Sequence, residues 1–225
     1  MEKVLFHGSE RIVSPPIFGE GNPRNDYGLG FYCTESLALA REWASSETAD
    51  GFANQYILDL DGLSVLNLNG PGFNILNWLA VLLENRIFDL RTPVAVQGKR
   101  YLLENFLPEY ASYDVLVGYR ADDSYFSFSK AFLENGISLE QLRRAMQLGN
   151  LGEQVVLKSQ KAFGRIRFVK TEPVESSLYY PQKRLRDQNA RKEYFRMLEE
   201  TPVTGAHFLV NIMGEKWLNN DPRLF

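Results

Sequence analysis

The sequence contains a single cysteine, Cys33, and only two histidines, His7 and His207. One cysteine excludes an internal disulfide and a cysteine cluster for zinc, so a reducing compartment is expected. Long apolar runs are absent as well, and the longest, around residues 78–83, is far too short to span a bilayer. No N-terminal stretch combines a basic start, an apolar run and a cleavage site. We therefore expect a cytoplasmic protein with no membrane partner.

Common cofactor motifs are also missing. The sequence has no metal-ligand spacing, no Walker loop and no dinucleotide glycine fingerprint, since Gly28-x-Gly30 leads into a strand pattern and not into a helix. Asp122 and Asp123 could bind a metal or act as a base, but adjacent aspartates in a loop are more typical of turns and caps. Cys33 lies within a strand pattern, which is typical of a buried, inert thiol. We predict no metal site.

Composition is that of a globular protein. The 225 residues are 44% apolar and 24% charged, which suits one well-cored domain or a domain with an appended helical part. The net charge of −3 divides unevenly, because residues 158–196 carry +7 and the rest carries −10. That basic segment could face a polyanion such as nucleic acid or a phosphate-bearing ligand, or it could balance acidic neighbours.

Periodicity predicts a mixture of strands and helices. Alternating patterns predict strands at residues 3–9, 31–34, 55–60, 63–68, 113–119, 152–158 and 165–170, with the last sheet strand ending there. Helical patterns and stop signals predict helices at 37–44, 73–90, 98–107, 124–133, 138–149, 185–200 and 205–217, with Pro93 following the second of these. The fold class is therefore α+β.

Two short stretches combine a strand with small residues. The strand at 3–9 ends in His7, Gly8 and Ser9, which offer an imidazole, an approachable backbone and a hydroxyl to one ligand. In residues 26–34, two spaced glycines precede Tyr32 on the next strand, and side chains alternate along a strand, so Tyr32 is expected to face a cleft. A capped strand end and a hairpin with a packed tyrosine are the structural alternatives.

Three stretches together resemble a known family. His7-Gly8-Ser9, then Gly30-Phe31-Tyr32 with an alanine-rich helix after it, then a strand opened by Gln154, are similar to the His-Tyr-Glu branch of the ADP-ribosyltransferase superfamily. The sequence is most similar to a bacterial family with glutamine at the glutamate position. The resemblance covers roughly residues 3–170.

The resemblance implies a fold and a set of roles. It implies an ADP-ribosyltransferase-like split antiparallel β-sandwich over residues 1–170, with a helical layer at 73–133 and a C-terminal helical extension, 171–225, packed on it. NAD would be the substrate: His7 would bind the adenosine-side ribose, the Gly8 backbone the carboxamide, and Ser9 the nicotinamide-side ribose. Tyr32 would stack on the nicotinamide, and Gly30 belongs to the same NAD-binding motif.

The catalytic position departs from the family pattern. The resemblance implies a glutamate that binds the ribose and stabilises positive charge, and Gln154 stands there. An oxocarbenium-like transition state gains most from a fixed negative charge, while an amide offers a dipole and cannot act as a base. Glu153 is the candidate substitute. Adjacent strand residues point to opposite faces, so Gln154 is predicted to enter the cleft, with Glu153 on the rim where it could orient an acceptor.

The resemblance implies a bacterial toxin or effector that transfers ADP-ribose from NAD to a protein or nucleic-acid acceptor and releases nicotinamide. A neutralising partner protein is a further candidate. Two alternatives stay open: an NAD glycohydrolase toxin, which gives the ribose to water, and a non-catalytic module that binds NAD or ADP-ribose.

Overall fold

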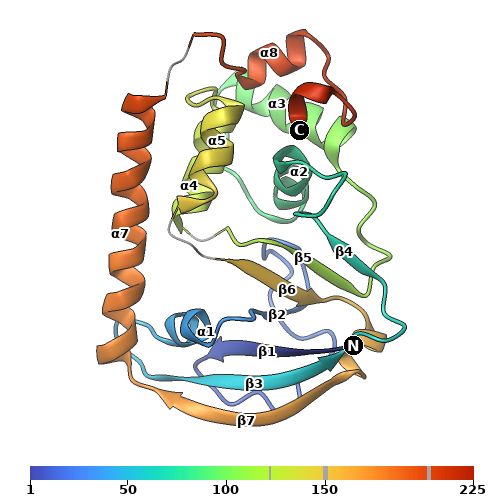
Figure 1. Cartoon of the computed structure of the whole chain (residues 1–225), viewed down its shortest axis with the longest axis vertical. Helices are drawn as coiled ribbons and strands as arrows, with labels where there is room; N and C mark the ends of the chain where they lie inside the picture. The colour runs from blue at the N-terminus through green and yellow to red at the C-terminus, as the bar shows by residue number, and fades with distance from the viewer. Residues whose placement is uncertain (122, 149–151, 202–203) are drawn as a thin grey trace.

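The computed structural model describes residues 1–121, 123–148, 152–201 and 204–225 and has an α+β fold, which confirms the predicted class. Its elements are arranged as in Figure 1 and run β1 (Glu2–Ser9), β2 (Phe31–Cys33), α1 (Leu37–Ala44), β3 (Gly51–Asp59), β4 (Val65–Asn67), α2 (Ile75–Asn85), α3 (Pro93–Phe106), β5 (Val115–Tyr119), α4 (Asp123–Leu133), α5 (Leu139–Ala145), β6 (Glu153–Leu157), α6 (Gln160–Phe163), β7 (Ile166–Val174), α7 (Ser176–Glu200), α8 (Leu209–Gly214) and a 3₁₀ turn (Pro222–Leu224).

The strands form two sheets. One has the order β1-β3-β7 and is antiparallel throughout, and the other has the order β2-β6-β5-β4. The prediction of two antiparallel sheets is wrong at one edge, because β4 pairs with β5 in parallel. Between these strands the chain passes through α2 and α3, and a long helical connection of this kind lets the next strand run in the same direction.

Backbone hydrogen bonds link the two sheets. The N–H of Phe6 donates to the carbonyl of Thr34 over 2.8 Å, and the N–H of Thr34 donates back to Phe6 over 2.9 Å. Phe6 belongs to β1, and Thr34 follows β2 directly. This bridge brings the end of β1 against β2, although the two strands belong to different sheets.

Helix α1 approaches β1 and β3 unusually closely. A Cβ added to Gly8 would lie 1.9 Å from the carbonyl oxygen of Ala40, and one added to Gly51 would lie 2.1 Å from that of Ala44. Atoms do not approach each other so closely, so glycine on the strands and alanine on the helix are required for this packing. The close contact of α1 with these strands therefore depends on glycine, which has no side chain, and on alanine, which has only a methyl group.

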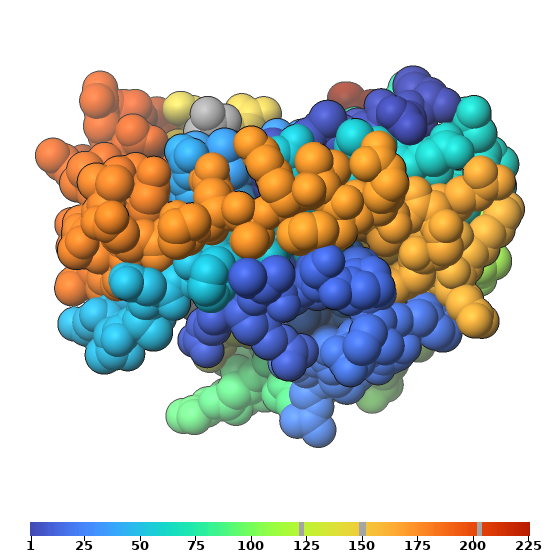
Figure 2. Space-filling model, turned by 90° about the horizontal axis from the view of Figure 1, so that it is seen from below, coloured from blue at the N-terminus to red at the C-terminus, as the bar shows by residue number. Residues whose placement is uncertain are grey.

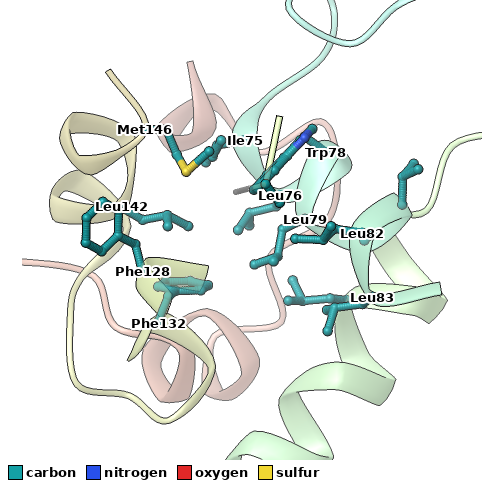
Figure 3. Close-up of a cluster of buried hydrophobic side chains, with 14 of the residues drawn as sticks. Ile75, Leu76, Trp78, Leu79, Leu82, Leu83, Phe128, Phe132, Leu142 and Met146 are labelled. Carbon is teal, nitrogen blue, oxygen red and sulfur yellow. The ribbon is translucent and has the colours of Figure 1, made fainter. Parts of the chain in front are cut away.

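The main hydrophobic core lies around α2. Side chains on all sides of this helix are buried, as expected for a helix that is covered on every face. Figure 3 shows α2 residues directed toward α4 and α5, with Leu79 and Leu83 facing Phe132, and Ile75 beside Met146. Helices α4 and α5 thus pack against α2.

The C-terminal residues belong to that same core. The ring of Tyr194 on α7 stacks on Phe128 with centroids 4.2 Å apart, and Trp217 and Leu224 are buried in the cluster that includes α2. Helix α7 runs along the edge of the molecule beside α1, α4 and α5 (Figure 1). Residues after 174 are therefore fastened to both the sheet region and the helical region.

Several element boundaries differ from the sequence expectations. Helix α7 starts at Ser176 and not near 185, because Pro181 is accommodated in its second turn, where it removes a single backbone donor. Helix α3 starts at Pro93, which occupies its first turn while the Thr92 side chain accepts a hydrogen bond from Ala95. Strand β7 continues to Val174, past the expected end at residue 170, because β3 pairs with it along its length.

Several residues of the basic segment, 158–196, pair with acids from other parts of the chain. Seen from below in Figure 2, β7 and the start of α7 form a band across this face of the molecule. Arg165 pairs with Asp59 at 3.1 Å, and Arg186 on α7 pairs with Glu42. These pairs favour the interpretation that the segment balances acidic neighbours. No helix in the described part of the chain is long and apolar enough to cross a membrane.

Candidate functional site

A polar cleft of about 270 Å³ lies where the two sheets meet. Both sheets and α1 contribute to its walls, which are formed by His7, Gly8, Asn25, Asp26, Tyr32, Trp43, Arg86, Arg120, Ala121 and Gln154. This volume lies just below the range for small-molecule sites, roughly 300–1,000 Å³, so a larger ligand would extend out of the cleft.

His7 lies near the C-terminal end of β1, where contacts with β2 hold it in place. Its Nδ1 lies 2.7 Å from the carbonyl oxygen of Tyr32, and its ring centroid lies 4.6 Å from that of Phe31. Burial lowers the pKa of His7, and the hydrogen bond to the carbonyl opposes part of that shift. Because a carbonyl only accepts, Nδ1 carries the proton, and the neutral imidazole has Nε2 as its acceptor.

Tyr32 contributes its ring to the cleft. Its hydroxyl donates to the carbonyl of Gly28 over 2.6 Å and accepts from the N–H of Tyr27 over 3.0 Å. Burial raises its pKa above the ordinary tyrosine value. The hydroxyl is thus used to hold the preceding loop, which has a positive φ of 74° at Gly28. A fixed, flat ring in a cleft wall suits stacking against a planar ligand.

Gln154 and Glu153 face opposite ways, as strand alternation predicts. Gln154 is 3% exposed and lines the cleft, whereas Glu153 is exposed and accepts a hydrogen bond from Asn69 Nδ2 over 2.8 Å. Gln154 pairs across the sheet with Gly118, so no side chain of the neighbouring strand stands beside it on that face. Gln154 is the inward residue, and Glu153 lies outside the cleft.

Two further residues implied by the resemblance lie outside the cleft walls. The Ser9 hydroxyl donates to the carbonyl of Arg11 over 2.7 Å and accepts from Asn54 over 3.0 Å. A Cβ on Gly30 would lie 2.8 Å from the carbonyl oxygen of Leu157, so β6 requires glycine there. Neither Ser9 nor Gly30 lines the cleft. Gly8 does line the cleft. The residue at this position must also lack a side chain, because the backbone of α1 packs directly against it.

The sequence interpretation missed the charged residues of the cleft. Asp26 is 5% exposed, and its carboxylate accepts from Arg86 Nη1 at 2.8 Å, from the N–H of Ala121 at 2.8 Å and from Gln154 Nε2 at 2.7 Å. The only sequence signal for Asp26 was its position just before the glycine-rich stretch. Arg86, at the C-cap of α2, had none, since a basic residue is ordinary at a helix end.

Trp43 and Arg120 form another part of the wall. The guanidinium carbon of Arg120 lies 4.3 Å from the centre of the Trp43 ring. The indole Nε1–H of Trp43 is buried, and no acceptor for it is found in the described part of the chain. A buried donor without a partner costs about 1–3 kcal/mol, which a ligand oxygen would recover. The cleft thus combines the cation of Arg120 with an Arg86–Asp26 ion pair and the indole donor, and these groups suit a polar ligand that carries oxygen acceptors.

Cys33 and His207, the remaining cysteine and histidine, do not line the cleft. Cys33 is fully buried, and burial raises the pKa of its thiol. His207 lies elsewhere, with Nδ1 2.7 Å from Glu140. No group of three histidine, cysteine or acidic residues that could hold a metal occurs in the described ranges, and Asp122 and the side chain of Asp123 are not part of them. The cleft is thus equipped to bind and orient a ligand by hydrogen bonds and stacking.

Comparison with known proteins connects the chain to one family. Residues 3–168 match the family described as "Protein of unknown function (DUF3990)". No curated protein and no solved structure gives a significant match. The matched range includes every residue of the cleft wall.

Proposed function

The chain belongs to the DUF3990 family, and from its cleft we propose that it binds NAD and transfers ADP-ribose to a macromolecular acceptor, with release of nicotinamide. One observation carries the proposal. His7, Gly8, Tyr32 and Gln154 come from three strands that are distant in sequence, and they line one cleft. These are four of the residues that the resemblance to ADP-ribosyltransferases singled out. The finer fold assignment, a split sandwich of that type, is part of the same proposal.

In this proposal the planar nicotinamide stacks on the ring of Tyr32, and the ribose lies between His7 and Gln154. His7 Nε2 accepts a hydrogen bond from a hydroxyl of the ligand, since Nδ1 is committed to the Tyr32 carbonyl. The guanidinium of Arg120, which lines the cleft, favours the pyrophosphate. The rest of the dinucleotide extends out of the cleft.

The reaction breaks the bond between the nicotinamide nitrogen and the ribose C1′. The bonding electron pair leaves with nicotinamide, which becomes neutral, and C1′ develops oxocarbenium character. A nucleophilic atom of the acceptor then bonds to C1′ from the other face and loses its proton to solvent. Orientation and electrostatic stabilisation by the cleft are what the protein supplies.

A binding module is the second candidate, and Gln154 is the observation that favours it. An amide at this position accepts a ribose hydrogen bond but has no negative charge to stabilise the oxocarbenium. A protein with this cleft could then hold NAD or ADP-ribose without turnover. Transfer to water, as in a glycohydrolase, is the remaining alternative for the same site.

The test measures NAD binding by calorimetry and nicotinamide release by chromatography, with and without cell lysate as the acceptor source. His7→Ala and Tyr32→Ala should each weaken NAD binding by roughly 5- to 150-fold, because each removes about 1–3 kcal/mol of contact. Phe195→Ala is the matched control, since Phe195 is an exposed aromatic residue on α7. It should change neither quantity.

The outcomes separate the candidates. Release that requires lysate supports the transferase, equal release without lysate supports the glycohydrolase, and binding without release supports the binding module. Absence of NAD binding by the native protein, or variants at His7 and Tyr32 that bind as tightly as the native chain, would refute the proposal.

A further inference from the structure

Asp26 lies directly behind Gln154 in the cleft. Its Oδ2 is 2.7 Å from Gln154 Nε2 and 2.8 Å from the N–H of Ala121, while Oδ1 is 2.8 Å from Arg86 Nη1. The side chain of Asp26 is 7% exposed and that of Arg86 is 31% exposed. The carboxylate is therefore shielded from water, while the guanidinium that pairs with it is partly hydrated.

These contacts determine which way the Gln154 amide is turned. Nε2 donates one hydrogen to Asp26 and lies 3.3 Å from the carbonyl oxygen of Tyr119, so both of its N–H groups have acceptors. A flipped amide would set its oxygen against a carboxylate and a carbonyl, which is repulsive. The oxygen Oε1 is consequently the group that Gln154 has for a ligand in the cleft.

We propose that Asp26 is a positioning residue for the reaction, and that Asp26 and Gln154 together replace the missing catalytic glutamate. This inference rests on the proposed function. Asp26 directs Oε1 toward the ribose, and by accepting from Nε2 it polarises the amide and increases the negative charge on Oε1. The negative charge that a glutamate would place at position 154 lies on Asp26 instead, one hydrogen bond farther from the ligand.

The pair also accounts for glutamine at position 154. A glutamate beside Asp26 would put two carboxylates within hydrogen-bond distance, and like charges so close cannot both ionise without a large cost. Glutamine donates to Asp26 and avoids that repulsion. The pair thus carries one negative charge, and exchanging the two groups would conserve both that charge and the hydrogen bond.

The test uses Asp26→Asn and the exchanged double variant Asp26→Asn with Gln154→Glu. Asp26→Asn should lower kcat for nicotinamide release by roughly 10- to 100-fold, the range for outer partners of functional residues, with the NAD dissociation constant within about threefold of native. The double variant should recover kcat to within about tenfold of the native value, since the charge then contacts the ribose directly, while one carboxylate oxygen at position 154 replaces Nε2 near the Tyr119 carbonyl. Glu104→Gln, which neutralises an exposed acid on α3, should change nothing.

Rescue distinguishes positioning from a merely structural role, because a destabilised cleft would not regain kcat when the charge is moved. If Asp26→Asn does not fold, the double variant, which restores the side-chain hydrogen bond, decides alone. The inference is overturned if Asp26→Asn keeps native kcat, if the folded double variant stays at least tenfold below native, or if the native protein binds NAD without release. A native protein that does not bind NAD refutes the proposed function itself.

Discussion

Replacing Gly8 by alanine tests whether this glycine is required by the packing of α1. The added Cβ would lie 1.9 Å from the carbonyl oxygen of Ala40 and 2.7 Å from the backbone nitrogen of Ala44. Since real Cβ contacts essentially never fall below 3.0 Å, α1 must move away from β1 by at least 1.1 Å. Both obstructing atoms belong to the backbone, so a side-chain rotation cannot relieve the contact.

We expect Gly8→Ala to lower the free energy of unfolding by about 1–3 kcal/mol, the usual cost of overpacking. For a chain of this size the melting temperature should fall by roughly 2–12 °C. The displaced helix carries Trp43, so the cleft should also change and NAD binding should weaken together with stability. Urea denaturation and calorimetry measure the two effects.

Gly214 provides the matched control, because open space surrounds its Cβ position and its φ is not positive. Gly214→Ala should leave stability unchanged or raise it slightly, as alanine favours a helix more than glycine does. A Gly8→Ala protein within about 0.5 kcal/mol of native would refute the packing argument, since surface substitutions without structural consequence fall in that range.

Three further outcomes follow from buried charges. Arg186→Ala should destabilise the protein by about 3–5 kcal/mol in urea denaturation, because it leaves the buried carboxylate of Glu42 without its partner. The control, Arg196→Ala, removes an exposed ion pair and should cost under about 1 kcal/mol. Equal losses of stability in the two variants would contradict this prediction. Burial lowers the pKa of Lys158 to about 8, below its unfolded value. The free energy of unfolding of the native protein should therefore rise by roughly 1–2 kcal/mol, relative to that of Lys158→Met, between about pH 8 and 9.5. Stability curves of the two proteins that run parallel over this pH range would refute the prediction. Burial also lowers the pKa of His7, so the native protein should lose stability as pH falls below about 6.5, and denaturation of His7→Gln should show a smaller loss.

Local sequence signals were sufficient for much of the fold and for one half of the cleft. Strand alternation predicted that Gln154 faces the cleft and Glu153 faces away from it, because successive side chains on a strand must point to opposite faces, and the structure has this arrangement. Helix α5 begins where the sequence predicted a helix, because Ser138 and Gln141 form a local capping box and are bonded reciprocally. Such signals work when the cause of a structure lies within a few residues of it.

Boundaries were less predictable where distant contacts outweigh a local breaker. Pro181 argues against a helix before residue 185, yet α7 continues through it. The pairing of Arg186 with Glu42 and the stacking of Tyr194 on Phe128 hold this helix along the body and offset one lost hydrogen bond. The parallel pairing of β4 with β5 likewise depends on how α2 and α3 carry the chain between them.

By itself, the sequence determined which residue types stand at the strand ends and which of them share a face, and the resemblance to ADP-ribosyltransferases added the prediction that His7, Tyr32 and Gln154 belong together. Only the tertiary structure decided what surrounds them. Asp26 and Arg86 are 60 residues apart, and Asp26 and Gln154 are 128 apart. No periodicity or spacing encodes such contacts, because they arise when two sheets and a helix end meet, and burial there forces each charge to find a partner.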